Sequence, residues 1–188
     1  MRMRAVINGN YGGLAMDTLE SRVARLEAIE SIKQLKARYL DACDRKQPDR
    51  VRSCFTDGEV VIDYDRVGVL GSADELEDLF RRYGCEDHVV EMHHAQNPQI
   101  TLHDETFATG RWGLYYHLID TRAQAVTQLG GFYEDEYRRQ DGDWKISATR
   151  FRVTSTQIFD LSEGLARAVF AGSAAPESLD SVANQGGQ

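Results

Sequence analysis

Hydrophobic positions recur at helical spacing near the start of the chain. From Asp17 onward, apolar side chains return every three or four residues, with Glu, Arg and Lys between them. The set comprises Leu19, Val23, Leu26, Ile29, Ile32, Leu35 and Tyr39. This pattern predicts one long helix or two helices in tandem. After Pro48, the four-residue spacing of Val51 and Phe55 predicts a short helix over 49–55.

The stretch from 59 to 83 combines a strand signal with a helix signal. Residues 59–64 (Glu-Val-Val-Ile-Asp-Tyr) favour a strand, and we expect Gly68 and Gly71 to close the turn after it. Ser72 followed by Glu75 forms a capping box, which predicts that a helix begins there and ends near residue 83.

Long alternating stretches make up the rest of the domain. Predicted strands occupy about 88–103, 106–120 and 124–139, and another runs over about 144–158 after the hairpin signal Asp141-Gly142. A short helix over 161–170 is expected to follow. Helices followed by a meander of strands indicate an α+β domain. In it, a curved antiparallel sheet wraps around the N-terminal helix and forms a cone with an open pocket.

Composition fits one domain of this kind. The chain has 188 residues, of which 41% are hydrophobic. We assign the domain to 17–170, with a flexible segment at 1–16 and a disordered tail at 171–188. A net charge of −8 argues against nucleic acid and membrane surfaces as partners and suits a small neutral or cationic ligand. The start lacks the apolar run of a signal peptide, and the cysteines lack metal or disulfide spacing, so we expect a cytoplasmic protein.

The chain lacks GxGxxG, Walker, HExxH and GxSxG motifs, and we expect neither a cofactor nor a metal. His93 and His94 are neighbours in a predicted strand, so their side chains point to opposite faces and only one can face the cone. This divergence also argues against a shared metal. Pro98 has no N–H to donate, which predicts an edge strand or a bulge at that point.

Alternation assigns faces in the later strands. One face of the second long strand carries Trp112, Leu114, Tyr116 and Leu118. Tyr116 is therefore either a hydroxyl in the pocket or a cap of the core. We expect the acidic residues at 134–136 to form a solvated face. Arg150 and Arg152 share a face of the last strand, where they either bind a substrate anion or, as the simpler expectation, pair with those acids.

Tyr39 and Asp44 lie near the end of the first predicted helix. A carboxylate there faces the negative end of the helix dipole, which costs about 0.3–1 kcal/mol. Asp44 is therefore either solvated or held for chemistry. A histidine paired with an aspartate is a common general base, and a tyrosine hydroxyl can donate to an oxygen on which charge develops. Tyr39, Asp44 and one histidine would suit proton abstraction next to a carbonyl, leading to isomerisation or loss of water.

Over about residues 26–158 the chain resembles SnoaL-like members of the NTF2-like superfamily. The segments that carry the resemblance are 29–44, 92–100, 108–112 and 141–146. The similarity is greatest to the bile-acid 7α-dehydratase branch. Scytalone dehydratase, hexachlorocyclohexane dehydrochlorinase and ketosteroid isomerase are more distant relatives. Because relatives associate as dimers or trimers, the resemblance implies a homodimer or homotrimer.

The resemblance also implies site residues. In the dehydratases, a Tyr and an Asp of the first helix act with a His of the strand, and these positions fall on Tyr39, Asp44 and His93. A further Asp of the bile-acid enzymes falls on Tyr116, and a late Arg falls near Val153, so the substrate stays open. The implied activity is that of a cofactor-independent lyase, a dehydratase acting on a steroid-like or polycyclic hydroxy compound that bears a carbonyl.

In this interpretation His93 removes the proton, Asp44 orients His93, and Tyr39 binds the enolate oxygen or the departing hydroxyl, with Tyr116 as an auxiliary donor. The candidates for the wall of the pocket are Trp112, Phe55, Tyr64 and Leu114. Two alternatives remain. One is an isomerase that uses the same residues. The other is a non-catalytic ligand-binding or assembly subunit, in which Asp44 and His93 would not touch.

Overall fold

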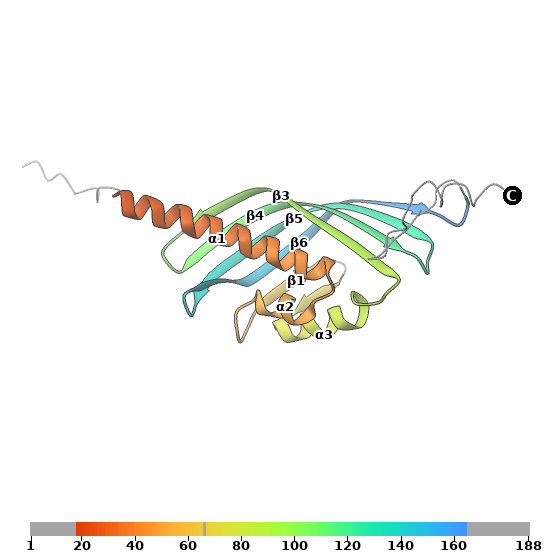
Figure 1. Ribbon diagram of the computed structural model, residues 1–188, viewed down its shortest axis with the longest axis horizontal. Helices are drawn as coiled ribbons and strands as arrows, with labels where there is room; N and C mark the ends of the chain where they lie inside the picture. The colour runs from red at the N-terminus through yellow and green to blue at the C-terminus, as the bar shows by residue number, and fades with distance from the viewer. Residues whose placement is uncertain (1–17, 66, 165–188) are drawn as a thin grey trace, which may run out of the picture.

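The computed structural model describes residues 18–65 and 67–164, in which helices pack on one six-stranded sheet (Figure 1). The helices are α1 (Leu19–Asp44), α2 (Pro48–Ser53) and α3 (Ala73–Tyr83). The strands are β1 (Val61–Tyr64), β2 (Gly68–Leu70), β3 (Val89–Leu102), β4 (Phe107–Asp120), β5 (Ala125–Gln140) and β6 (Asp143–Asp160). The predictions for 1–16 and 171–188 lie outside the described residues.

The sheet has the strand order β2-β1-β6-β5-β4-β3. Its four long strands form the antiparallel meander that the sequence predicts. Strand β1 pairs in parallel with β6, with Val61 opposite Ala148, so the sheet is mixed. The sheet is curved, and α1 lies across one of its faces (Figure 1). The predicted α+β fold, with a curved sheet around the first helix, is confirmed.

Helix α1 is one continuous helix of 26 residues. The side chain of Thr18 caps it by accepting a hydrogen bond from the backbone N–H of Ser21 at 3.1 Å. Its second half supplies the buried face, which includes Ile32, Leu35, Lys36, Tyr39, Leu40, Ala42 and Cys43. Leu19, Val23 and Leu26 continue the same periodic pattern but are exposed. The first turns of α1 lie at the margin of the sheet, so periodicity alone predicts too much burial there (Figure 1).

The predicted capping box of α3 is confirmed. The Ser72 hydroxyl accepts from the backbone N–H of Glu75 at 3.1 Å, and the Glu75 carboxylate accepts from the backbone N–H of Gly71 at 3.0 Å. The turn expected at Gly68 and Gly71 is wrong in position. The chain reverses earlier, because Gly68 already pairs with Tyr64 and begins β2 with a φ of 105°, which suits glycine.

Strand β3 lies at the edge of the sheet, and its pairing with β4 shifts between Gln96 and Gln99. Both expectations from Pro98 are therefore confirmed. The hairpin at Asp141-Gly142 is also confirmed, with φ angles of 53° and 90°. The helix expected over 161–170 does not form in its described part. Residues 161–164 form a turn, in which the carboxylate of Asp160 accepts from the backbone and hydroxyl of Ser162.

The acidic residues of β5 do not share one solvated face. Asp135 is only 2% exposed, because it alternates to the inner face, whereas its two glutamate neighbours point outward. Arg150 pairs with Glu136 at 2.9 Å, as predicted. Arg152 pairs instead with Asp63 of β1, since the parallel β1–β6 pairing brings that carboxylate alongside β6.

Candidate functional site

Asp44, the last residue of α1, contacts His93 of β3. Its Oδ1 lies 2.7 Å from His93 Nδ1. The same carboxylate accepts from the backbone N–H of His93 at 3.1 and 3.2 Å. Because Asp44 engages Nδ1, Nε2 is the ring nitrogen that can act as a base toward a ligand. Of the two neighbouring histidines, His93 lines the apolar cavity described next, and His94 is exposed.

A cavity of about 430 Å³ lies between α1, α3 and the inner face of the long strands. Its volume is within the usual range for small-molecule sites. Most of its wall is apolar and comes from Val51, Val67, Leu76, Leu79, Phe80, Val89, Leu114, Leu118, Leu129, Phe151 and Val153. The polar part of the lining consists of the phenols of Tyr39, Tyr64 and Tyr133, the group Glu91, His93 and Tyr116 on β3 and β4, and Cys43, Asp65 and Tyr83.

Tyr39 and Tyr64 form a hydroxyl pair in the cavity wall. Their oxygens are 2.6 Å apart, and either group can donate to the other. One proton is used inside the pair, and the second O–H can donate to another acceptor, such as a ligand oxygen. Burial raises the pKa of Tyr39 and of Tyr64, so both phenols stay protonated at neutral pH. The pair can therefore donate to an oxygen on which negative charge develops.

Tyr116 lies beside His93, with ring centroids 4.8 Å apart. Its hydroxyl donates to the carboxylate of Glu91 at 2.6 Å. Burial, together with the charge of Glu91, raises the pKa of Tyr116. The expectation that Tyr116 serves as an auxiliary donor does not fit this arrangement, because its only proton already goes to Glu91. Glu91 was not among the residues chosen from the sequence, although it stands two positions before His93 on the same strand face.

Two other candidates for the wall lie outside this cavity. Phe55 is buried in the core, where its ring packs edge-on against Tyr39 at 5.5 Å. Trp112 lines a smaller, separate cavity that reaches Asp44 and His93 from the side of Lys33. Its indole N–H donates to the hydroxyl of Tyr137 at 2.9 Å. Tyr64 and Leu114 do line the main cavity.

A buried ion pair lies behind the aromatic wall. Lys36 Nζ is 2.8 Å from Asp135 Oδ2, and both side chains are fully buried. Tyr137 and Thr149 also donate to Asp135, each at 2.7 Å. Burial lowers the pKa of Lys36, while the charge of Asp135 acts in the opposite direction. The sequence does signal the burial of Lys36, which falls inside the apolar stripe of α1, but it does not signal its partner.

Lys36 also lies against the pocket aromatics. Its Nζ is 3.5 Å from the centroid of the Tyr133 ring and 5.4 Å from that of Tyr39. The cation therefore packs against the two rings that form part of the cavity wall. The Cys43 thiol lines the same cavity, and burial raises its pKa, which keeps it protonated and a poor nucleophile.

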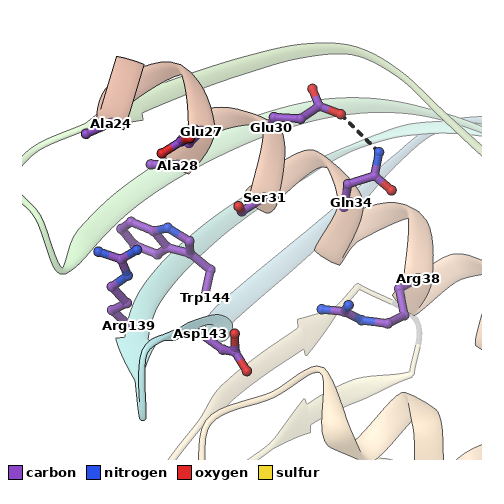
Figure 2. A pocket seen from close by; sticks show the side chains of 10 residues that line it. All are labelled: Ala24, Glu27, Ala28, Glu30, Ser31, Gln34, Arg38, Arg139, Asp143 and Trp144. Atoms are coloured by element: carbon purple, nitrogen blue, oxygen red, sulfur yellow. Dashed lines mark hydrogen bonds between the residues drawn. The ribbon is translucent and has the colours of Figure 1, made fainter. Parts of the chain in front are cut away.

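A larger groove of about 600 Å³ lies elsewhere, between the first half of α1 and the β5–β6 hairpin. Figure 2 shows Arg139 against Trp144 at its floor, with Ala28 and Ser31 of α1 above. Charged and polar residues make up most of the lining of this groove, and none of its lining residues belongs to the His93 cavity. We therefore assign the site to the smaller apolar cavity.

Within residues 18–65 and 67–164, no three His, Cys, Asp or Glu side chains are arranged to hold a metal ion. In the same part of the chain, no helix has the length and apolar character needed to cross a membrane.

Solved structures with the same fold include a candidate scytalone dehydratase from Novosphingobium aromaticivorans. It is 21% identical over 72% of this chain and 90% of that chain, with a TM-score of 0.67. A hexachlorocyclohexane dehydrochlorinase from Novosphingobium barchaimii is 19% identical over 74% and 94%, also with a TM-score of 0.67. A Mycobacterium tuberculosis protein of unknown function is 20% identical over 89% and 90%, with a TM-score of 0.63.

The model of one protein family matches more than half of the sequence. It describes a SnoaL-like domain and matches residues 24–150, which include most of α1, strands β3, β4 and β5, and both members of the Asp44–His93 pair. The chain therefore belongs to the SnoaL-like family.

Proposed function

We propose that this protein is a cofactor-independent lyase that eliminates water from a hydroxy compound activated by a carbonyl. His93 is the general base, Asp44 positions it, and the Tyr39–Tyr64 pair binds the carbonyl oxygen. The observation that carries the proposal is the 2.7 Å contact between Asp44 and His93 Nδ1, at the wall of an apolar cavity. The non-catalytic alternative predicts that Asp44 and His93 do not touch, so the contact favours the lyase.

The reaction begins when Nε2 of His93 takes a proton from the carbon next to the carbonyl. The electron pair of the broken C–H bond moves toward the carbonyl oxygen and forms an enolate, to which the second O–H of the tyrosine pair donates. Asp44 stabilises the imidazolium that forms. When the enolate collapses, the C–O bond of the hydroxyl breaks, and the departing group takes the proton back from His93 and leaves as water.

The apolar wall and the volume of about 430 Å³ support a compact, fused-ring substrate. Two of the solved structures of this fold carry the names of elimination enzymes, a scytalone dehydratase and a hexachlorocyclohexane dehydrochlorinase, which supports the reaction class. The steroid-like or polycyclic substrates expected from the sequence are part of this proposal.

The test uses 3-hydroxy-1-tetralone, a fused-ring ketone with a hydroxyl on the carbon next to the acidic one. Loss of water gives a product that is lighter by one water molecule, as measured by mass spectrometry. We expect the wild type to accelerate this loss over buffer, and His93→Ala to abolish the acceleration. A β,γ-unsaturated ketone such as cyclohex-3-enone tests the isomerase alternative, because moving its double bond next to the carbonyl leaves the mass unchanged. Acceleration of that shift without loss of water from the hydroxy ketone would assign the protein as an isomerase. No acceleration of either reaction would contradict the proposal.

A further inference from the structure

Glu91 is a carboxylate in a largely apolar cavity, and the elimination proposed above gives it no role. It stands two positions before His93 on β3, so both side chains lie on the same strand face, and both line the cavity. Through Tyr116, which donates to it at 2.6 Å, Glu91 is linked to a ring that packs against His93. A second polar centre therefore lies next to the proposed base.

This centre accepts hydrogen bonds but does not donate them. An ionised carboxylate has about four lone-pair sites, of which Tyr116 uses one. The phenol of Tyr116 donates its only proton to that hydrogen bond and has none left for a ligand. The Tyr39–Tyr64 pair, by contrast, holds a second proton that is not used between its own two hydroxyls. The cavity thus offers a donor for a carbonyl oxygen at one centre and acceptors for a hydroxyl or ammonium group at the other.

The charges of the wall favour the same kind of ligand. Asp65 and Glu91 are the acidic residues that line the cavity, and no lysine or arginine among the described residues lines it. Lys36 is close, but its charge is paired with Asp135 behind the wall. A ligand carboxylate or phosphate next to Glu91 would bring like charges together in a largely apolar cavity, which is unfavourable.

We propose that Glu91, held by Tyr116, determines substrate specificity. It selects ligands that present a hydroxyl or ammonium group beside the reacting carbon, and it rejects carboxylates and phosphates. The inference rests on the proposed function only in treating this cavity as the substrate site. Its test measures binding, whereas the proposed function is tested by turnover.

Three naphthalene probes of matched size test the selection: 2-naphthylmethanol, 2-naphthylmethylammonium and 2-naphthoate. Their affinities for the wild type are measured by calorimetry at neutral pH. We expect the alcohol and the ammonium to bind at least about tenfold more tightly than the carboxylate, since a hydrogen bond to a charged group contributes roughly that much to affinity.

In Glu91→Gln, the amide oxygen still accepts from Tyr116, but the charge is gone. Carboxylate binding should then gain, ammonium binding should fall by about tenfold, and the alcohol should change little.

Glu134→Gln is the matched control, because it removes the same charge from the exposed outer face of β5. It should leave all three affinities unchanged. His93→Ala should keep the ranking of the probes while losing turnover, which separates this inference from the proposed reaction. If Glu91→Gln folds and keeps the wild-type ranking of the three probes, Glu91 serves only to accept the hydrogen bond of Tyr116, and the proposal is wrong. The wild type alone also tests the proposal, which matters if the variant fails to fold. The proposal is overturned if the wild type binds the carboxylate as tightly as the alcohol, or if it binds none of the three probes.

Discussion

Asp44 holds His93 by two groups at once, since its carboxylate lies 2.7 Å from Nδ1 and 3.1 Å from the backbone nitrogen. Strand β3 is the edge of the sheet, so the backbone N–H of His93 has no neighbouring strand to donate to. The carboxylate of Asp44 accepts this hydrogen bond instead. The contact therefore ties the end of α1 to the sheet and also fixes the orientation of the imidazole. The two hydrogen bonds explain how a carboxylate is tolerated at the negative end of a helix.

Asp44→Asn separates these two roles. The amide oxygen can still accept from the backbone of His93, but the charge that supports the imidazolium is lost. We expect turnover of 3-hydroxy-1-tetralone to fall by about 10²–10⁴-fold, the usual worth of general base catalysis, while unfolding stays cooperative. Asp41→Asn, on the exposed face of the same helix, is the control and should keep wild-type turnover. Wild-type turnover in Asp44→Asn would contradict the role of Asp44.

Tyr39→Phe and Tyr64→Phe each break the hydroxyl pair. Each leaves one buried phenol without its partner, so we expect each to destabilise the fold by about 1–3 kcal/mol and to slow turnover. Because the two groups act together, the double variant should cost less than the sum of the single ones. Chemical denaturation of the three variants measures this coupling. Strictly additive free energies would show that the 2.6 Å contact contributes nothing.

Lys36→Met removes one partner of the buried ion pair. The carboxylate of Asp135 is then left uncompensated, which we expect to cost about 3–5 kcal/mol in the free energy of unfolding. Adding Asp135→Asn removes the stranded charge and should recover part of that loss. Urea denaturation of the single and double variants checks this. A single variant as stable as the wild type would mean that the pair contributes little.

Alkaline pH should destabilise the protein through its buried phenols. Burial raises the folded-state pKa of Tyr39, Tyr64, Tyr116, Tyr133 and Tyr137 above their ordinary value of 10.0. Above that value the unfolded chain loses these protons while the folded chain keeps them. The stability that these phenols contribute should therefore be complete below about pH 10, and the free energy of unfolding should fall as pH rises further. Denaturant titrations on both sides of pH 10, with tyrosinate absorption as a second probe, test this. A flat profile would contradict the burial of these phenols.

The meander of long strands follows from local signals in the sequence, and alternation limits the inward position to one of His93 and His94. The choice of His93 as the partner of Asp44 follows from the resemblance to the dehydratases and not from a local pattern. The partners of Tyr64, Glu91 and Lys36 could not be predicted in this way. Each depends on the register between strands or on the depth at which α1 crosses the sheet, which no local pattern encodes. The parallel pairing of β1 with β6 is another long-range choice of this kind.

The most direct test of the central claim, that His93 and Asp44 remove a proton next to a carbonyl, is deuterium exchange into 1-tetralone. This ketone has the acidic C–H but no leaving group, so mass spectrometry in D₂O measures proton abstraction alone. We predict that the wild type accelerates exchange at the carbon beside the carbonyl, and that His93→Ala and Asp44→Asn exchange at or near the rate of buffer. Exchange by the wild type at the buffer rate, or by His93→Ala at the wild-type rate, would contradict the account.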